Sequence, residues 1–361
     1  MMNIAVLGSG NGGCAVAFDW AMHKHSVHLF DFERFPDTIE AVKRQGGIYA
    51  EGELEGFAPV QYAGHDIEQA LNDVEVICLV GPAYSTRPFA EACRPYLRKG
   101  HVVLVCPGSC MGSLAFKNAA GLDLRSRDVI VAETSTLPYA VRVVEPGRIR
   151  VFLKVKDGLF LAAVPSRDTP QVLERTQGVY PLLVTAKNVL QTSLQNGNPV
   201  IHPAVTLLNA ALIGRTEGDF YFYEEGVTAA VGQLIKAIDR ERISIGQELD
   251  IDVIPEPDLG YMQGYMAERS YDTGYAEAPG FRGIKAQSSL NHRYFREDVA
   301  FGLVFWRSLA EQIGVETPTI SAVIQLASVL TGQDYLAQGK RTMESLGLSQ
   351  YATEELGRLL A

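Results

Sequence analysis

A glycine-rich turn directly after the first apolar run constrains the fold of this chain more than any other feature. The run Asn3 to Leu7 leads into Gly8-Ser9-Gly10-Asn11-Gly12-Gly13, which has the spacing G-x-G-x-x-G. A helix-compatible stretch follows from Cys14 to Met22, and a second apolar run over 27–30 ends at Asp31. This order of strand, turn, helix, strand and acid is typical of a βαβ unit that binds a dinucleotide.

Each glycine has a separate physical role in such a turn. Gly8 permits the tight bend, Gly10 lets the backbone approach a pyrophosphate, and Gly13 lets the helix pack closely on the strand. The helix N-terminus also presents unpaired N–H groups and a positive dipole end to the phosphates. The alternative, an ordinary glycine-rich turn, leaves the placement of Asp31 to chance.

The choice of cofactor depends on two residues of opposite charge. Asp31 is placed to accept hydrogen bonds from a ribose 2′-hydroxyl, and its carboxylate repels a 2′-phosphate, so the sequence favours NAD. Arg34 lies three residues further on and would suit NADP if it reached a 2′-phosphate. Its other interpretation is a solvated surface charge. We therefore predict NAD, with NADP as the open alternative.

Composition limits the class of protein. The chain has 361 residues, 47% hydrophobic and 20% charged, which fits a globular protein of two domains. Its formal charge of −10 argues against nucleic acid and anionic membrane as partners. It has no apolar run near twenty residues and no signal-peptide pattern at its start. The five cysteines form an odd number without zinc spacing, so we expect reduced thiols, no metal site and a cytoplasmic location.

The first half of the chain alternates between strand and helix patterns. Apolar runs over 74–80, 101–105 and 129–132 predict buried strands, and Ser85 to Leu97 predicts a helix. Two further runs, 148–155 and 158–164, predict a hairpin around Asp157-Gly158. In a doubly wound parallel sheet, ligands bind at the carboxyl ends of the strands. Pro82, which follows the 74–80 run, is therefore either a cofactor contact or simple turn punctuation.

The second half has a helical pattern. Apolar spacing predicts helices over 203–212, 228–249, 298–313 and 319–330, followed by two short helices. The fold class is therefore an α/β Rossmann domain with a doubly wound, mostly parallel sheet, followed by an all-α C-terminal domain. We place the domain boundary between Asp168 and Val189, which gives residues 1–188 and 189–361. The segment 259–281 is rich in tyrosine and glycine and predicts either a mobile lid or partner surface, or a packed connecting loop.

Two stretches of the helical half carry groups that suit acid–base chemistry. His202 lies at the expected entry to a helix, and an imidazole with a pKa near ~6.5 exchanges a proton near neutrality. On spacing alone it is equally a capping residue. Arg293 and Asp298 lie in a second stretch, where Arg293 would clamp a carboxylate and Asp298 would orient the His202 ring. The alternative is a first-turn acid beside solvated arginines.

The whole chain resembles the octopine/nopaline (opine) dehydrogenase family, and is most similar to its bacterial members of the N-(1-carboxyethyl)-norvaline type. The resemblance is carried by Gly8 to Gly13, Glu133-Thr134-Ser135, Thr192-Ser193-Leu194, His202-Pro203 to Asn209-Ala210, Arg293-Tyr294-Phe295 with Glu297-Asp298-Val299, and Leu346-Gly347-Leu348. It implies that His202 and Asp298 are the catalytic pair and that Arg293 binds a substrate carboxylate. It also implies NAD(P)H-dependent reductive condensation of an amino acid with a 2-oxo acid, usually pyruvate, through an imine.

The complete set of predicted site residues follows from these arguments. Glu133 would pair with a cationic amino-acid side chain or serve as a structural acid at a strand end. The predicted catalytic residues are His202 and Asp298, and the predicted substrate-binding residues are Arg293, Glu133 and Asn209. The predicted cofactor-binding residues are Gly8, Ser9, Gly10, Asn11, Gly12, Gly13, Asp31, Arg34 and Pro82.

Two other functions are consistent with the same features. One is a related dehydrogenase of the hydroxy-acid or glycerol-phosphate type, although no lysine of the helical half lies in a convincing motif. The other is an NAD-binding sensor without turnover, in which the tyrosine-rich segment would bind a partner. A homodimer through the helical domain is expected by analogy alone.

Overall fold

The computed structural model describes residues 1–361, which divide into two compact units. Unit 1 comprises Met1–Thr192 together with Ala361, and unit 2 comprises Ser193–Leu360. The helix α7 (Val189–Leu194) spans the division. None of the helices combines the length and apolar character needed to cross a membrane.

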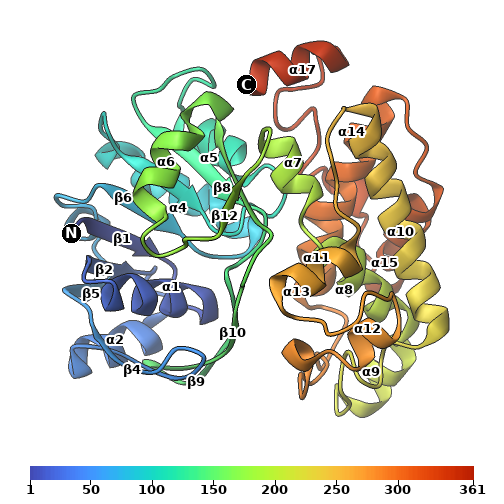
Figure 1. The fold of residues 1–361 in the computed structure, drawn as a ribbon, viewed down its shortest axis with the longest axis horizontal. Coiled ribbons are helices and arrows are strands. Elements are labelled where there is room, and N and C mark those ends of the chain that lie inside the picture. Colours follow the sequence, from blue (N-terminus) through green and yellow to red (C-terminus); the bar gives the residue numbers. More distant parts are fainter. The chain divides into compact units, whose positions relative to one another are not determined.

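Unit 1 contains a large sheet and a small one (Figure 1). The large sheet has the strand order β12-β11-β8-β7-β6-β1-β2-β5, and the small sheet has the order β4-β3-β10-β9. The strands are β1 (Asn3–Leu7), β2 (Ser26–Phe30), β3 (Gly47–Gly52), β4 (Gly56–Pro59), β5 (Tyr62–Gly64), β6 (Val76–Leu79), β7 (Val102–Val105), β8 (Ile130–Thr134), β9 (Tyr139–Glu145), β10 (Arg148–Lys154), β11 (Leu159–Val164) and β12 (Leu183–Thr185). The helices are α1 (Asn11–Met22), α2 (Pro36–Gln45), α3 (Ile67–Ala70), α4 (Thr86–Cys93), α5 (Gly112–Ala120) and α6 (Thr169–Thr176), with short turns η1 (Ala83–Ser85), η2 (Arg94–Tyr96) and η3 (Ser166–Asp168).

The large sheet is parallel except where β11 runs antiparallel to β8. Side chains alternate across it and fill a separate core on each face. Ile4 and Val6 of β1 pack into the core that contains α1, whereas Ala5 and Leu7 pack into the core that contains Phe89 of α4. Because both faces are covered, the strands are apolar throughout. The predicted α/β fold class is confirmed.

The predicted hairpin over 148–164 is wrong. β10 pairs with β9 and β3 in the small sheet, whereas β11 pairs with β8 and β12 in the large one. Burial explains the separation: all six residues of β11 are buried, while those of β10 alternate between buried and exposed. A fully buried strand suits the covered large sheet, and an alternating strand suits a sheet with one wet face. The hairpin is β9–β10, which turns at Pro146-Gly147 with Gly147 at φ +79°.

Unit 2 is helical (Figure 1). It contains α8 (Asn198–Leu208), α9 (Ala210–Thr216), α10 (Ala229–Glu248), α11 (Glu256–Gln263), α12 (Thr273–Ala276), η4 (Pro279–Phe281), α13 (Arg293–Arg296), the π-helical η5 (Asp298–Leu303), α14 (Val304–Ile313), α15 (Pro318–Thr331), α16 (Tyr335–Gln338) and α17 (Thr353–Leu360). α10 follows the prediction closely, because Thr228 caps it by accepting a hydrogen bond from the Val231 N–H.

The helix predicted over 203–212 begins earlier than expected. α8 starts at Asn198 with Pro199 in its first turn, so Pro203 lies inside the helix rather than at its start. Proline has no N–H, so the Pro199 carbonyl loses its intrahelical donor at this position. His202 therefore lies in the second turn of a buried helix.

Candidate active site

The glycine turn of unit 1 is shaped by two close approaches of backbone. Gly8 has φ +113°, and a Cβ there would lie 2.1 Å from the Val80 carbonyl oxygen. A Cβ on Gly13 would lie 1.8 Å from the Gly8 carbonyl oxygen. A side chain at Gly13 would therefore push α1 away from the turn, and one at Gly8 would collide with the backbone that follows β6.

Gly10 differs from these two glycines because it borders open space. It is the N-cap residue of α1, and a Cβ built on it meets no atom within 4 Å. An open helix N-terminus with no side chain in front of it fits the pyrophosphate of a dinucleotide. The neighbouring Asn11 accepts a hydrogen bond from the Val143 N–H at 2.7 Å through Oδ1, which ties the turn to β9. A Cβ on Gly12 would be 3.0 Å from the Leu137 side chain.

Asp31 lies at the end of β2 and is buried against the glycine turn. Its Oδ2 accepts hydrogen bonds from the Ser9 N–H at 2.7 Å and the Ser9 hydroxyl at 2.8 Å. Its Oδ1 accepts one from the Phe32 N–H at 2.8 Å. The acid is thus fixed beside the turn, as the predicted ribose contact requires.

The other two predicted cofactor residues, Arg34 and Pro82, follow β2 and β6. The Arg34 guanidinium is exposed and lies 4.9 Å from the centre of the Phe32 ring and 5.2 Å from that of Phe35. These are cation–π contacts, which hold the cation at the surface. Pro82 follows β6 and begins η1, where its carbonyl accepts hydrogen bonds from Ser85.

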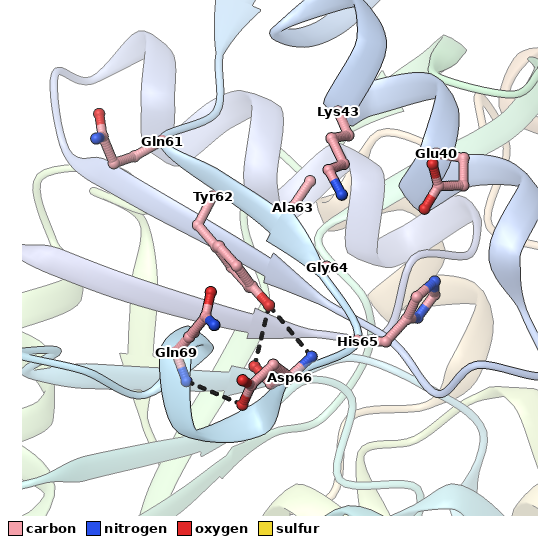
Figure 2. A pocket seen from close by; sticks show the side chains of 9 residues that line it. All are labelled: Glu40, Lys43, Gln61, Tyr62, Ala63, Gly64, His65, Asp66 and Gln69. Atoms are coloured by element: carbon pink, nitrogen blue, oxygen red, sulfur yellow. Dashed lines mark hydrogen bonds between the residues drawn. The ribbon is translucent and has the colours of Figure 1, made fainter.

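A cavity of about 530 Å³ lies beside β5 (Figure 2). Its lining is mostly polar or charged and consists of Glu40, Lys43, Gln61, Tyr62, Ala63, Gly64, His65, Asp66 and Gln69. His65 links this cavity to Asp31, because its Nδ1 hydrogen-bonds the Asp31 carbonyl oxygen at 2.7 Å. The ends of β2 and β5 are therefore held together by side chains as well as by the sheet.

In unit 2, the structure brings His202 and Asp298 into direct contact. His202 Nδ1 lies 2.8 Å from Asp298 Oδ2, and both side chains are buried. The second ring nitrogen, Nε2, lies 3.0 Å from the Tyr223 hydroxyl. The Tyr294 ring stacks on the imidazole with centroids 4.0 Å apart and planes 25° apart. The histidine is thus held at both nitrogens and on one face.

A π-helical turn places Asp298 at the histidine. The Glu297 carbonyl accepts hydrogen bonds from both the Phe301 and the Gly302 N–H groups, which widens the first turn of η5. Gly302 packs against the first turn of α8, since a Cβ there would lie 2.4 Å from Pro199 Cγ. This close approach joins the elements that carry the two predicted catalytic residues.

Burial controls the charge of the aspartate. It raises the pKa of Asp298 to about 7, while the positive charge of Arg293 acts in the opposite direction. The Arg293 side chain is 43% exposed and its Nη1 lies 3.6 Å from Glu297 Oε2. Arg293 precedes Asp298 by five residues in the sequence, and its exposed side chain is accessible to a carboxylate.

The two other predicted substrate residues have structural partners. Glu133 is fully buried on β8 and accepts hydrogen bonds from the Ser113 N–H, the Ser113 hydroxyl and the Thr192 hydroxyl at 2.7–2.8 Å. These contacts favour its interpretation as a structural acid, which here holds the first turn of α5. Asn209 ends α8 and donates to the Val205 and Gly226 carbonyl oxygens. Substrate contact by either residue stays a prediction.

Sequence reasoning did not identify Tyr223. Its hydroxyl meets His202 only because the chain between α9 and α10 folds back on α8, and no motif marks that contact. The one available signal is the aromatic run Tyr221-Phe222-Tyr223. Tyr294 lies in the stretch around Arg293 that carries the family resemblance, but its stacking on His202 follows from tertiary packing alone.

Comparison with known proteins identifies the family of this chain. Residues 185–331 match the family model described as the alpha-helical domain of NAD/NADP octopine/nopaline dehydrogenase. Residues 3–109 match the N-terminus of NAD-dependent glycerol-3-phosphate dehydrogenase. The chain is 37% identical to an opine dehydrogenase of Arthrobacter sp. (strain 1C), over 96% of this chain and 95% of that protein. It is 28% identical to the protein ocs of Agrobacterium tumefaciens (strain Ach5), over 96% of each chain.

Solved structures share the fold over the full length. A structure of octopine dehydrogenase with NADH and L-arginine matches with a TM-score of 0.77 at 18% identity, covering 99% of this chain and 98% of that one. Yersinopine dehydrogenase with NADP⁺ bound matches with a TM-score of 0.68 at 18% identity, covering 100% of this chain and 97% of that one. These structures show the shared fold, and the 37% identity to the Arthrobacter opine dehydrogenase confirms the sequence-based resemblance.

Proposed function

Because the chain belongs to the opine dehydrogenase family, we propose that His202, Asp298 and Arg293 carry its reaction. The enzyme is an NAD(P)-dependent oxidoreductase that acts on CH–NH bonds. It condenses the amine of an amino acid with the carbonyl of a 2-oxo acid and reduces the imine to a secondary-amine dicarboxylate. NAD(P)H, when bound, supplies the hydride. The observation that carries the proposed site is the buried 2.8 Å contact between His202 and Asp298.

The His202–Asp298 pair has the geometry for proton transfer. With Nδ1 bound to Asp298, the imidazole is held in one tautomer, and Nε2 is the nitrogen that exchanges a proton. Condensation needs a proton on the departing carbonyl oxygen, and reduction leaves a new amine to be protonated. Asp298 stabilises the charged imidazolium form at each of these steps.

Arg293 would anchor a substrate carboxylate. Its planar guanidinium presents parallel N–H donors that match a carboxylate, and both products and substrates of this reaction carry one. We propose pyruvate as the 2-oxo acid, since octopine dehydrogenase has been solved with NADH and pyruvate. The same protein has also been solved with L-arginine and with agmatine. The amino acid used here is the open variable.

An oxidation assay tests the reaction and the pair together. NADH or NADPH consumption is followed with pyruvate, with and without a panel of neutral, acidic and basic amino acids. We expect oxidation only when an amine is present, and a loss of at least about 100-fold in kcat for His202→Ala and Asp298→Asn. His23→Asn, at a half-exposed histidine of unit 1, serves as the control. Full turnover in both site variants, or oxidation that needs no amine, contradicts the proposal.

The same panel resolves the two interpretations of Glu133. If Glu133 binds a cationic side chain, Glu133→Gln lowers kcat/KM for arginine and lysine more than for alanine or norvaline. If it only holds α5, the variant loses thermal stability and affects all amino acids alike, because its hydrogen bonds to Ser113 and Thr192 are weakened.

We also propose that the enzyme forms a homodimer through α15. This helix contains no charged residue, and Leu326, Val329 and Leu330 are 50%, 66% and 46% exposed. Their spacing puts them on one face, which is typical of a surface covered by a partner. Light scattering should give twice the chain mass, and Val329→Glu should give the monomer. A monomeric wild-type enzyme contradicts the assignment.

A reducing compartment such as the cytoplasm is the location we propose. All five cysteines are free and buried, so the fold depends on no disulfide. Titration of the purified, denatured protein with a thiol reagent should find every cysteine reduced, and cell fractionation should find the activity in the cytoplasm.

A further inference from the structure

We propose that Tyr223 is a positioning residue for His202, and that the tyrosine-rich segment 259–281 holds Tyr223 in place through Phe281. This inference rests on the proposed role of His202. It assigns a purpose to the segment that the sequence marks as unusual and that the reaction chemistry leaves unexplained.

The first step is the contact at Nε2. Asp298 occupies Nδ1 at 2.8 Å and Tyr223 occupies Nε2 at 3.0 Å, so each ring nitrogen has a partner. When the imidazole is neutral with its proton on Nδ1, the Tyr223 hydroxyl donates to Nε2. When the imidazole is protonated, Nε2–H donates to the Tyr223 oxygen. A hydroxyl performs both roles, whereas a carbonyl or an ammonium group performs only one.

Burial makes this contact effective. His202 and Tyr223 are each 4% exposed, so water competes little with the hydrogen bond between them. Tyr294 stacks on the imidazole and prevents the ring from tilting. Two hydrogen bonds and one stacked ring therefore fix the orientation of the imidazole before substrate binds.

The second step is the support behind Tyr223. The Phe281 ring stacks on the Tyr223 ring with centroids 4.2 Å apart and planes 13° apart. Tyr265 in turn stacks on Phe281 at 5.0 Å and 17°. Three nearly parallel rings therefore connect the tyrosine-rich segment to the histidine partner.

The third step is the anchoring of the segment itself. The Tyr271 hydroxyl donates to Asp239 Oδ2 at 2.6 Å, and the Tyr275 hydroxyl donates to Glu256. Tyr275 is fully buried, and Asp239 lies on the long helix α10. The segment is thus packed rather than free, which favours the packed-loop interpretation over the lid. The aromatic rings of the segment therefore hold Tyr223 in a fixed position relative to α10 and α11.

Kinetics of matched variants test the inference. Tyr223→Phe keeps the ring that stacks on Phe281 and removes only the hydroxyl, so we expect kcat to fall about tenfold with both substrate KM values within about twofold of wild type. Tyr221→Phe makes the same chemical change two residues away, at a side chain that is 39% exposed and lies against Lys285. The kcat and KM values of Tyr221→Phe should therefore equal those of the wild-type enzyme.

A double-mutant cycle tests the link through Phe281. Phe281→Leu should lower kcat, and Phe281→Tyr, which keeps the stacked ring, should restore it. If Phe281 acts through the Tyr223 hydroxyl, the double variant Tyr223→Phe/Phe281→Leu should be no slower than Tyr223→Phe alone. Circular dichroism melting of each variant verifies that the fold is intact.

Three outcomes would overturn the inference: wild-type kcat in Tyr223→Phe, a change confined to KM, or additive losses in the double variant. His202→Ala, assayed beside them, separates this inference from the proposed function. If His202→Ala keeps its activity, the proposed site is wrong. If His202→Ala is inactive while Tyr223→Phe is fully active, only the role of Tyr223 is wrong.

Discussion

Two buried acids, one in each unit, hold the positions that we propose for cofactor choice and for proton transfer. Asp31 is held by three donors next to the glycine turn, where its carboxylate would discriminate between NAD and NADP. Asp298 is buried beside the His202 imidazole, where it would orient this proposed base and stabilise its charged form. The two acids differ in their partners. Asp31 accepts hydrogen bonds from backbone N–H groups and a hydroxyl, whereas Asp298 contacts the His202 imidazole, which can gain or lose a proton.

The role of Asp31 leads to a prediction about cofactor choice. Asp31→Ser should raise the KM for NADH about tenfold, because a ribose hydroxyl loses a charged acceptor. It should also improve the use of NADPH relative to NADH, because the repulsion of a 2′-phosphate is removed. The measurement is kcat/KM for each cofactor at saturating pyruvate and amino acid.

Arg34→Gln is the matched test of the competing cation. If Arg34 remains on Phe32 and Phe35 as in the structure, this variant leaves the NADH to NADPH ratio unchanged. A selective loss of NADPH activity would instead assign Arg34 to the 2′-phosphate. An unaltered ratio in Asp31→Ser would contradict the role of Asp31.

At the scale of elements, the close approach of α8 and η5 brings His202 and Asp298 together. Gly302 removes the side chain that would collide with Pro199, and the widened turn of η5 brings Asp298 toward His202. Proline inside α8 and the π-turn of η5 are both departures from regular helix. They lie next to His202 and Asp298, the residues that we propose as the catalytic pair.

Gly302→Ala should therefore separate the pair. The added methyl group would lie 2.4 Å from Pro199 Cγ, so η5 must move away from α8. We expect a loss of about 1–3 kcal/mol in the free energy of unfolding, as for other overpacked sites, and a fall in kcat larger than the change in KM. Urea unfolding and steady-state kinetics measure the two effects.

Gly214→Ala is its control. Gly214 lies in α9, and a Cβ there meets no atom within 4 Å. The same substitution should leave kcat unchanged and stabilise the helix by about 0.5–1 kcal/mol. If Gly302→Ala and Gly214→Ala changed kcat and the free energy of unfolding equally, the contact between α8 and η5 would not be what holds His202 and Asp298 together.

The sequence predicted correctly those elements whose structure is determined by a local residue pattern. The βαβ unit and α10 follow from glycine spacing, apolar period and the Thr228 cap. The partners of β10 and β11 were missed because they depend on which sheet face is covered, whereas two strand-like runs that are adjacent in sequence favour a hairpin. The family resemblance predicted His202 and Asp298 as a pair, and the structure shows them in contact, but Tyr223 depends on a fold-back of the chain that no local pattern encodes.

At the scale of the whole molecule, each of the two units contains one buried tryptophan, whose fluorescence can be used to follow the unfolding of that unit. Trp20 is buried on α1 of unit 1, and Trp306 is buried on α14 of unit 2. The chain contains no other tryptophan. Trp20→Phe therefore leaves Trp306 fluorescence as a report on unit 2 within the complete protein, and the unfolding of unit 2 can be followed by itself.

The stability of unit 2 should fall as the pH rises. Burial, and then the negative charge of Asp239, raise the pKa of Glu256 from 4.5 to about 8, although Arg242 opposes the shift. Between these two values the folded state binds one proton more than the unfolded state. Its stabilisation is complete below about pH 4.5 and is lost as the pH passes through about 8. One such group lowers the free energy of unfolding by about 1.4 kcal/mol for each unit of increase in pH between the two pKa values.

Glu256→Gln removes this titration and keeps an oxygen that accepts the Tyr275 hydroxyl. In the Trp20→Phe background, urea unfolding at pH 5 to 8 should show a shallower decline for Glu256→Gln, by about 1 kcal/mol per pH unit. Glu277→Gln, at an exposed acid just after α12, should follow the parent curve. Parallel curves for Glu256→Gln and its parent would show that Glu256 is ionised in the folded protein. A shallower curve would show that a neutral carboxyl anchors the tyrosine-rich segment, and through it Phe281 and Tyr223, at neutral pH.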